Sequence, residues 1–138
     1  MTQVSCTIAI QAPADFVWQV ISDFGAADLY LAGVVNCTAE GEGVGALRTL
    51  TSADGSAIVE RLEALDEAAQ RLSYSLLTDT PFGNCITAMA LRDLGPNRTE
   101  LACSASFQPV GIPESEAIEL MEGALAANCL ALKQFLER

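Results

Sequence analysis

The sequence predicts an α+β fold in which a seven-stranded antiparallel sheet is followed by one long helix. Residues 3–10 alternate between apolar and polar side chains, and six further strand-like runs lie between residues 34 and 108. Short connections rich in Gly, Pro and Asp separate these runs, and such connections favour antiparallel pairing. A helical pattern then begins near Pro113 and continues to the end of the chain.

The first strand is predicted to be followed by two short helices. The apolar residues of that strand share one face: Val4, Cys6, Ile8 and Ile10. Pro13 is typical of a helix start, and apolar residues at helical spacing then continue to about Ser22. We expect a second short helix over residues 26–31. The remaining strands are expected at 34–40, 44–52, 56–65, 70–78, 84–93 and 98–108.

A predicted hairpin places two opposite charges on an apolar face. The loop Ala53-Asp54-Gly55, in which Gly55 supplies the left-handed conformation, sets Arg48 opposite Glu60. Their neighbours on that face are apolar: Ala46, Leu50, Ile58 and Leu62. A desolvated charge costs several kcal/mol unless it is paired or used. The alternative is a register that differs by one residue, which would turn the pair into a surface ion pair.

The final helix carries acidic residues in its first turns and Lys133 near its end, which suits the helix dipole. Residues 123–132 contain no charged side chain. We expect a curved sheet to cover this stretch on most sides.

Composition predicts one domain over residues 1–138 and argues against several partners. The chain is 51% hydrophobic, its mean hydropathy is +0.32, and its net charge is −11. No apolar run reaches the ~18 residues of a membrane span, and we see no secretory signal. A strongly acidic chain repels nucleic acid and anionic membranes. We therefore expect a cytoplasmic protein without nucleic-acid or membrane partners, whose oligomeric state, monomer or homodimer, stays open.

Histidine is absent, which excludes Ser-His-Asp and Cys-His catalysis and the usual zinc triads. The five cysteines are dispersed and lack CxxC spacing, so we interpret them as reduced core residues. They are Cys6, Cys37, Cys85, Cys103 and Cys129. No phosphate-binding glycine motif precedes a helix. We expect no cofactor and no metal.

Several phrases, in order along the whole chain, resemble the START-like superfamily. They are APADFVWQVISDFGAADLYLAGV, GVGALRTLT, IVERLEALDEAAQRLSYSL and SASFQPVG. This superfamily includes the birch-pollen allergen and proteins described as polyketide cyclases/dehydratases or lipid-transport proteins. The resemblance implies a helix-grip fold, in which a seven-stranded curved antiparallel sheet surrounds a long C-terminal helix. Two short helices after the first strand close one end of an internal cavity.

Within this superfamily the sequence is similar to the branch of plant abscisic-acid receptors and lachrymatory factor synthase. The synthase-like pattern pairs a G-x-x-R strand with an E-[KR]-L strand, and that Arg and Glu are its catalytic pair. Residues 45–48 and 60–62 match it, so Arg48 and Glu60 become catalytic candidates. In the receptor-like pattern, Glu60, Tyr74 and Asn128 match residues that line the pocket.

Three departures argue against a hormone receptor. Val35 stands where the receptors have a carboxylate-anchoring Lys, and the bare turn 52–55 replaces their Pro-containing gate. Residues 80–82, Thr-Pro-Phe, replace their His-Arg-Leu latch.

Relatives also carry bulky aromatic residues where this chain has Tyr30, Cys85 and Cys103. Loss of that volume predicts a roomy apolar cavity. The candidate ligand-binding residues are Leu50, Ile58, Leu62, Leu76, Phe82, Cys85, Thr87, Cys103, Phe107, Leu120, Ala124 and Asn128.

Each candidate residue has a functional and a structural interpretation. Glu60 could serve as a general acid or base while Arg48 stabilises an enolate or oxyanion, with Tyr74 donating a proton. The same residues could instead be a structural pair and a wall residue. Asn128 could contact a ligand or cap a polar atom of a nearby strand. Phe82 could be a cavity lid or an exposed loop apex.

The sequence thus favours a binding protein for a small apolar ligand, a carrier or sensor for a lipid-, polyketide- or isoprenoid-like molecule. The first alternative is a cofactor-free cyclase, dehydratase or isomerase that uses Arg48 and Glu60. The second alternative is a protein-partner module that uses the loops around Phe82 and Tyr30.

Overall fold

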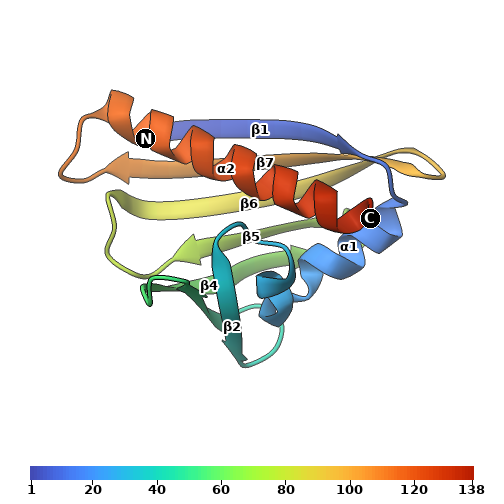
Figure 1. Ribbon diagram of the computed structural model, residues 1–138, viewed down its shortest axis with the longest axis horizontal. Helices are drawn as coiled ribbons and strands as arrows, with labels where there is room; N and C mark the ends of the chain where they lie inside the picture. Colours follow the sequence, from blue (N-terminus) through green and yellow to red (C-terminus); the bar gives the residue numbers. More distant parts are fainter.

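The computed structural model, which describes residues 1–138, contains a seven-stranded antiparallel sheet crossed by one long helix (Figure 1). The strand order is β1-β7-β6-β5-β4-β3-β2. The elements are β1 (Thr2–Ile10), α1 (Ala14–Ser22), η1 (Phe24–Leu29), β2 (Val34–Glu40), β3 (Leu47–Ser52), β4 (Ala57–Asp66), β5 (Arg71–Leu76), β6 (Phe82–Gly95), β7 (Arg98–Pro109) and α2 (Glu114–Leu136). The predicted helix-grip architecture is confirmed.

Several element boundaries differ from the sequence-based expectation by a few residues, and η1 and β3 are examples. The second short helix, η1, is a 3-10 helix that begins at Phe24, two residues before the expected start. Strand β3 begins at Leu47 instead of residue 44. Gly43 and Gly45 both have positive φ angles, so the chain is still turning there. The Gly45 N–H already donates to the Leu62 carbonyl of β4, but the regular strand begins only at Leu47.

The β3–β4 hairpin has the predicted register. Gly55 closes its loop with a φ of 89°, and the Asp54 carboxylate accepts hydrogen bonds from the backbone and hydroxyl of Ser56. Arg48 is directly opposite Glu60. The two charged side chains therefore lie on the same face of the sheet, as the residue count predicts.

Helix α2 is buried along one stripe only, which corrects the expectation that the sheet covers it on most sides. Figure 1 shows α2 running across β1 and β7, at one side of the sheet. The buried stripe consists of Ala117, Met121, Leu125, Cys129, Leu132 and Leu136. Leu120 is 52% exposed and Ala124 is exposed. Both residues directly precede stripe residues, so they are rotated by about a quarter turn toward solvent. The expectation that they line a cavity is wrong.

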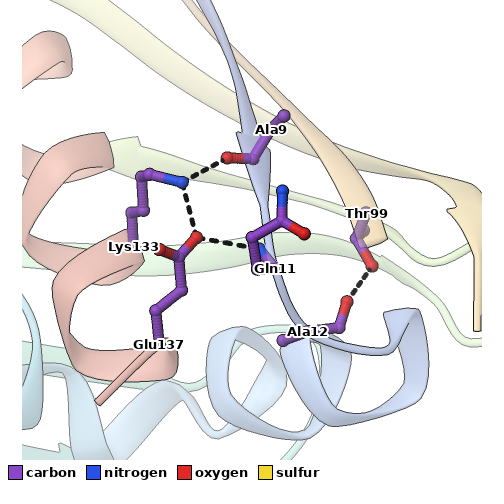
Figure 2. A network of polar contacts seen from close by, with 6 residues as sticks. All are labelled: Ala9, Gln11, Ala12, Thr99, Lys133 and Glu137. Carbon is purple, nitrogen blue, oxygen red and sulfur yellow. Dashed lines mark hydrogen bonds and ion pairs between the residues drawn. The ribbon is translucent and has the colours of Figure 1, made fainter. Parts of the chain in front are cut away.

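Polar contacts fix both ends of α2 to β1. At the beginning of the helix, the Thr2 hydroxyl donates to the Glu114 carboxylate at 2.6 Å. Near its end, the Lys133 ammonium donates to the Ala9 carbonyl at 2.8 Å (Figure 2). This lysine is the only one in the chain. The helix is thereby held along the edge strand at its two ends.

A small network extends this second anchor. Figure 2 shows that the Glu137 carboxylate lies between the Lys133 ammonium and the backbone N–H of Gln11. Beside it, the Thr99 hydroxyl donates to the Ala12 carbonyl at 2.7 Å. The end of α2, the end of β1 and the beginning of β7 therefore meet at one place.

The core lies between α2, the short helices and the inner face of the sheet. Its largest fully buried side chains include Phe107, Ile10, Ile21, Leu101 and Leu132. All five cysteines are free thiols; three are buried, and Cys6 and Cys37 are partly exposed. None of the helices combines the length and apolarity that crossing a lipid bilayer requires.

Candidate functional site

Arg48 and Glu60 form a buried ion pair on the inner face of the sheet. The guanidinium Nε and one terminal nitrogen contact the same carboxylate oxygen of Glu60, at 2.8 Å and 2.7 Å. The side chains are 3% and 11% exposed, respectively. Each charge is removed from water and compensated by the other, which is the condition under which buried charges persist.

The Arg48 guanidinium is also enclosed by two aromatic rings. Its central carbon lies 4.1 Å from the centroid of the Phe24 ring and 4.7 Å from that of Tyr74. A terminal nitrogen donates to the backbone carbonyl of Phe24 at 3.3 Å. Arg48 thus connects β3 to η1 and β5 by charge, hydrogen bond and cation–π contact. A planar guanidinium can make these contacts together, whereas a lysine cannot.

Burial and pairing together shift the pKa of both members. Burial raises the pKa of Glu60 above its ordinary value, and the neighbouring Arg48 opposes this only in part. Burial lowers the pKa of Arg48, but Glu60, Tyr74 and Tyr30 raise it by more, so the guanidinium stays charged. Glu60 is therefore the member of the pair that can gain a proton.

Two phenols border Arg48. Burial raises the pKa of Tyr30, and the Arg48 charge lowers it by less. The pKa of Tyr74 lies well above its ordinary value because the ring is buried and Glu60 adds a negative charge nearby. Both phenols are protonated at neutral pH and can donate a hydrogen bond to an oxygen placed beside them.

A cavity of about 20 Å³ lies between this polar group and α2. Its polar end is formed by Arg48, Tyr30 and Tyr74. Its apolar wall consists of Met89 and Leu101 from the sheet and of Leu125 and Leu132 from the helix. This volume admits one water-sized molecule. The cavity is therefore much smaller than expected. Side chains such as Met89, Leu101 and Leu125 occupy the space beside the small residue Cys103.

Asn128 links the two sides of the cavity. Its side-chain oxygen accepts a hydrogen bond from the backbone N–H of Ala32 at 3.2 Å. Ala32 follows η1, so Asn128 caps a loop atom and not a strand atom. Asn128 and Leu31 both line the cavity where this loop approaches α2.

The structure brings five of the predicted site residues to the cavity: Arg48, Tyr74, Thr87, Cys103 and Asn128. Glu60 lies behind the guanidinium of Arg48 and does not line the cavity. Any direct contact of a ligand with the ion pair would therefore be made by Arg48.

Seven other predicted residues pack in or around the core without reaching the cavity. They are Leu50, Ile58, Leu62, Leu76, Phe82, Cys85 and Phe107. Phe82 packs edge-on against Phe107, with ring centroids 5.1 Å apart. It is therefore neither a lid over this cavity nor an exposed loop apex.

Sequence reasoning missed several wall residues, although a signal for them exists. Leu125, Cys129 and Leu132 follow the four- and three-residue spacing of the buried helix stripe. Met89 lies two residues from Thr87 on β6, and Leu101 lies two residues from Cys103 on β7, so each pair shares the inner face of the sheet. The helix face that contains Leu125, Cys129 and Leu132, one residue along from the predicted face, forms the helical wall.

Comparison with known proteins agrees with this fold. A family model described as "Polyketide cyclase / dehydrase and lipid transport" matches residues 1–137. The structure of the protein XoxI from Bacillus cereus is similar with a TM-score of 0.90 and 25% identity, over 99% of this chain and 96% of that one. The Zhui aromatase/cyclase from Streptomyces sp. R1128 is similar with a TM-score of 0.78 and 22% identity, over 98% and 90% of the two chains.

A partial similarity connects the chain to the urease accessory protein UreF from Cereibacter sphaeroides. The two are 32% identical over 78 residues, which are 56% of this chain. The chain spans 37% of the length of these curated relatives.

Proposed function

Because the chain belongs to the polyketide cyclase / dehydrase and lipid transport family, we propose that it binds a small apolar molecule that carries an oxygen at one end. Residues 1–138 act as one ligand-binding domain, and the protein serves as a carrier or sensor. The ligand lies between α2 and the inner face of the sheet. Its chemical class is lipid-, polyketide- or isoprenoid-like.

The observation that carries this proposal is the polarity of the cavity wall. One end offers the Arg48 guanidinium and two protonated phenols, and the remainder is largely apolar. Because Glu60 already compensates the charge of Arg48, a neutral acceptor such as a carbonyl or phenol oxygen suits this end better than a carboxylate. The apolar wall would accommodate the rest of the molecule.

Binding requires the cavity to widen, since about 20 Å³ holds one water-sized molecule. The contacts of α2 with β1 fix the helix at both ends. Toward the segment after η1, by contrast, its single hydrogen bond joins Asn128 to Ala32. We therefore place the opening between α2 and residues 30–32, where the fewest polar contacts must break.

A matched pair of variants tests the location of the site. Thr87 lines the cavity, and Ile86 is 49% exposed on the opposite face of the same strand. Thr87→Phe should abolish binding of the uncharged apolar probe N-phenylnaphthylamine, measured by fluorescence, because the ring fills the space. Ile86→Phe should bind the probe like the parent protein. Equal binding by both variants contradicts the proposed site.

The chemistry of a natural ligand can be examined directly. Native mass spectrometry of protein purified from cells should detect an apolar molecule that dissociates on denaturation. Thr87→Phe protein prepared in parallel should lack this mass. Repeated preparations without any such molecule, together with no probe binding, would count against a carrier.

A second candidate is a cofactor-free cyclase, dehydratase or isomerase, and the two phenols beside Arg48 favour it. Arg48 could polarise a carbonyl while Tyr74 donates a proton. Glu60 would act through Arg48, because it does not line the cavity. Glu60→Gln separates the two candidates. A carrier should keep its affinity within roughly tenfold, whereas an enzyme that needs the carboxylate should lose ~100-fold in turnover while still binding.

The protein-partner alternative has the least support. Tyr30 is 7% exposed, and Phe82 packs against Phe107. Neither ring is presented for a partner.

A further inference from the structure

Three cysteine thiols converge where α2 crosses the sheet. Cys6 on β1 and Cys103 on β7 are directly opposite each other in the antiparallel ladder. Cys129 on α2 donates its S–H to the Cys103 sulfur at 3.6 Å. Cys6 and Cys129 are close enough for each thiol to affect the pKa of the other. Sequence spacing does not reveal this cluster, since its members lie on three separate elements.

We propose that Cys103 and Cys129 form a reversible disulfide, with a hydroperoxide as the oxidant, that crosslinks α2 to β7 at the wall of the binding cavity. The bond joins residues separated by 26 positions in the sequence. Both thiols line the cavity. The proposed binding function does not require either of them as a thiol.

The geometry favours this pair over the other cysteines. A disulfide bond is about 2.05 Å long, so the two sulfurs must approach by about 1.5 Å. Side-chain rotation and a small shift of α2 can supply that movement, because the helix meets the sheet on one side only. Cys37 on β2 faces the Phe24 carbonyl instead. Cys85 lies on β6, two residues from Thr87 and outside the cavity lining.

The reaction balances with two thiols and one hydroperoxide. One thiol attacks the peroxide, its sulfur becomes a sulfenic acid, and water or an alcohol leaves. The second thiol then attacks the sulfenic sulfur, the S–S bond forms, and water leaves. Two electrons from the sulfurs reduce the O–O bond. A small thiol such as glutathione reverses the step by thiol–disulfide exchange.

Access to the cavity controls the rate. Donation of its S–H to Cys103, together with burial, raises the pKa of Cys129 far above its ordinary value. Since the thiolate is the reactive form, the closed protein reacts slowly. Widening of the cavity would admit water and oxidant together. This part of the inference rests on the proposed binding function: a bound ligand should protect the thiols, and the crosslink should hinder binding by fixing α2 to the cavity wall.

The disulfide can be tested on the full chain without any ligand. The protein is treated with hydrogen peroxide, quenched with catalase, denatured and alkylated with a maleimide. Two of the five thiols should resist alkylation. Proteolysis without reductant should yield a peptide pair joined through Cys103 and Cys129. Treatment of the oxidised protein with glutathione before alkylation should remove this peptide pair. Random pairing, intermolecular pairing or only sulfinic acids would overturn the proposal.

Variants and a probe then separate the two parts of the inference. Cys103→Ser should prevent the crosslink, and the matched control Cys37→Ser should leave its yield unchanged. Saturating N-phenylnaphthylamine should slow crosslinking at least several-fold. If the crosslink forms at the same rate with the probe bound, the coupling to the binding site is wrong and the disulfide itself is supported. If the probe binds but no crosslink forms, the disulfide is wrong and the binding function stands.

Discussion

One carboxylate oxygen of Glu60 accepts from two nitrogens of Arg48, although the residues lie twelve positions apart on separate strands. This contact is largely shielded from bulk water, and it holds the guanidinium between the rings of Phe24 and Tyr74. The pair therefore does two things. It compensates two buried charges, and it presents one edge of Arg48 to the cavity.

Removing one member of the pair should destabilise the fold strongly. Arg48→Met should lower the free energy of unfolding by about 3–5 kcal/mol at neutral pH, because it leaves a buried carboxylate without a partner. The measurement is urea unfolding followed by circular dichroism. The double variant Arg48→Met, Glu60→Leu should regain most of the loss, since no buried charge remains. A double variant as unstable as the single one would contradict this account.

The pair should also leave a signature in the pH dependence of stability. The pKa of Glu60 is raised in the folded protein above its ordinary value of 4.5. Its contribution to stability is thus fully present below pH 4.5 and is lost as pH rises through the folded pKa. Glu60→Gln cannot titrate. The stability of the parent protein minus that of Glu60→Gln should therefore decrease as pH rises above 4.5.

This difference removes the effects of other carboxylates, such as Glu63 and Glu137, whose lowered pKa values act in the opposite direction. Urea titrations of the two proteins at a series of pH values provide the data. A difference that grows with pH would mean that attraction by Arg48 outweighs burial.

The link between Asn128 and Ala32 should control local opening. Asn128→Ala removes the acceptor of the Ala32 amide. Hydrogen exchange of that amide should accelerate roughly twofold to tenfold, the range expected for one modest hydrogen bond. Gln134→Ala, at an exposed position of the same helix, is the control and should leave the Ala32 amide unchanged. Equal exchange in all three proteins would show that another contact limits the opening.

Two leucines on α2 should differ in their effect on stability. Leu125 is 6% exposed and Leu120 is 52% exposed. Leu125→Ala should lower the free energy of unfolding by about 2–5 kcal/mol, because it enlarges the space beside the cavity. Leu120→Ala should change it by about 0.5 kcal/mol or less. Similar losses in denaturant unfolding would contradict the assigned orientation of the helix.

Local patterns were sufficient to predict the hairpin. The position of Gly55 sets the loop, the loop sets the register, and the register places Arg48 opposite Glu60. Each step depends on a few neighbouring residues, so no long-range information is needed. The START-like resemblance then predicted the helix-grip fold, in which the sheet packs against the long C-terminal helix. The family and structural comparisons confirm this fold.

The wall of the site was predicted less well, and α2 shows the reason. Its uncharged stretch contains apolar residues on every side, so the sequence pattern offers more than one apolar face and does not by itself select the one that meets the sheet. The predicted site uses the helix face that contains Leu120 and Ala124, whereas the structure buries the face that contains Leu125 and Cys129. The prediction of a roomy cavity was wrong for a related reason. The small residue Cys103 does not imply empty space, because Met89 and Leu101 line the same cavity.

The sequence alone therefore determined the strand order along the chain, the charged pair and the family of folds. The first two depend on the spacing of nearby residues, and the third depends on sequence motifs that occur in the family's order along the chain. Only the tertiary structure decided which side of α2 is buried, how little space the cavity holds and which cysteines meet. Those features arise where elements distant in the sequence pack together, and packing depends on side-chain volumes from several elements at once.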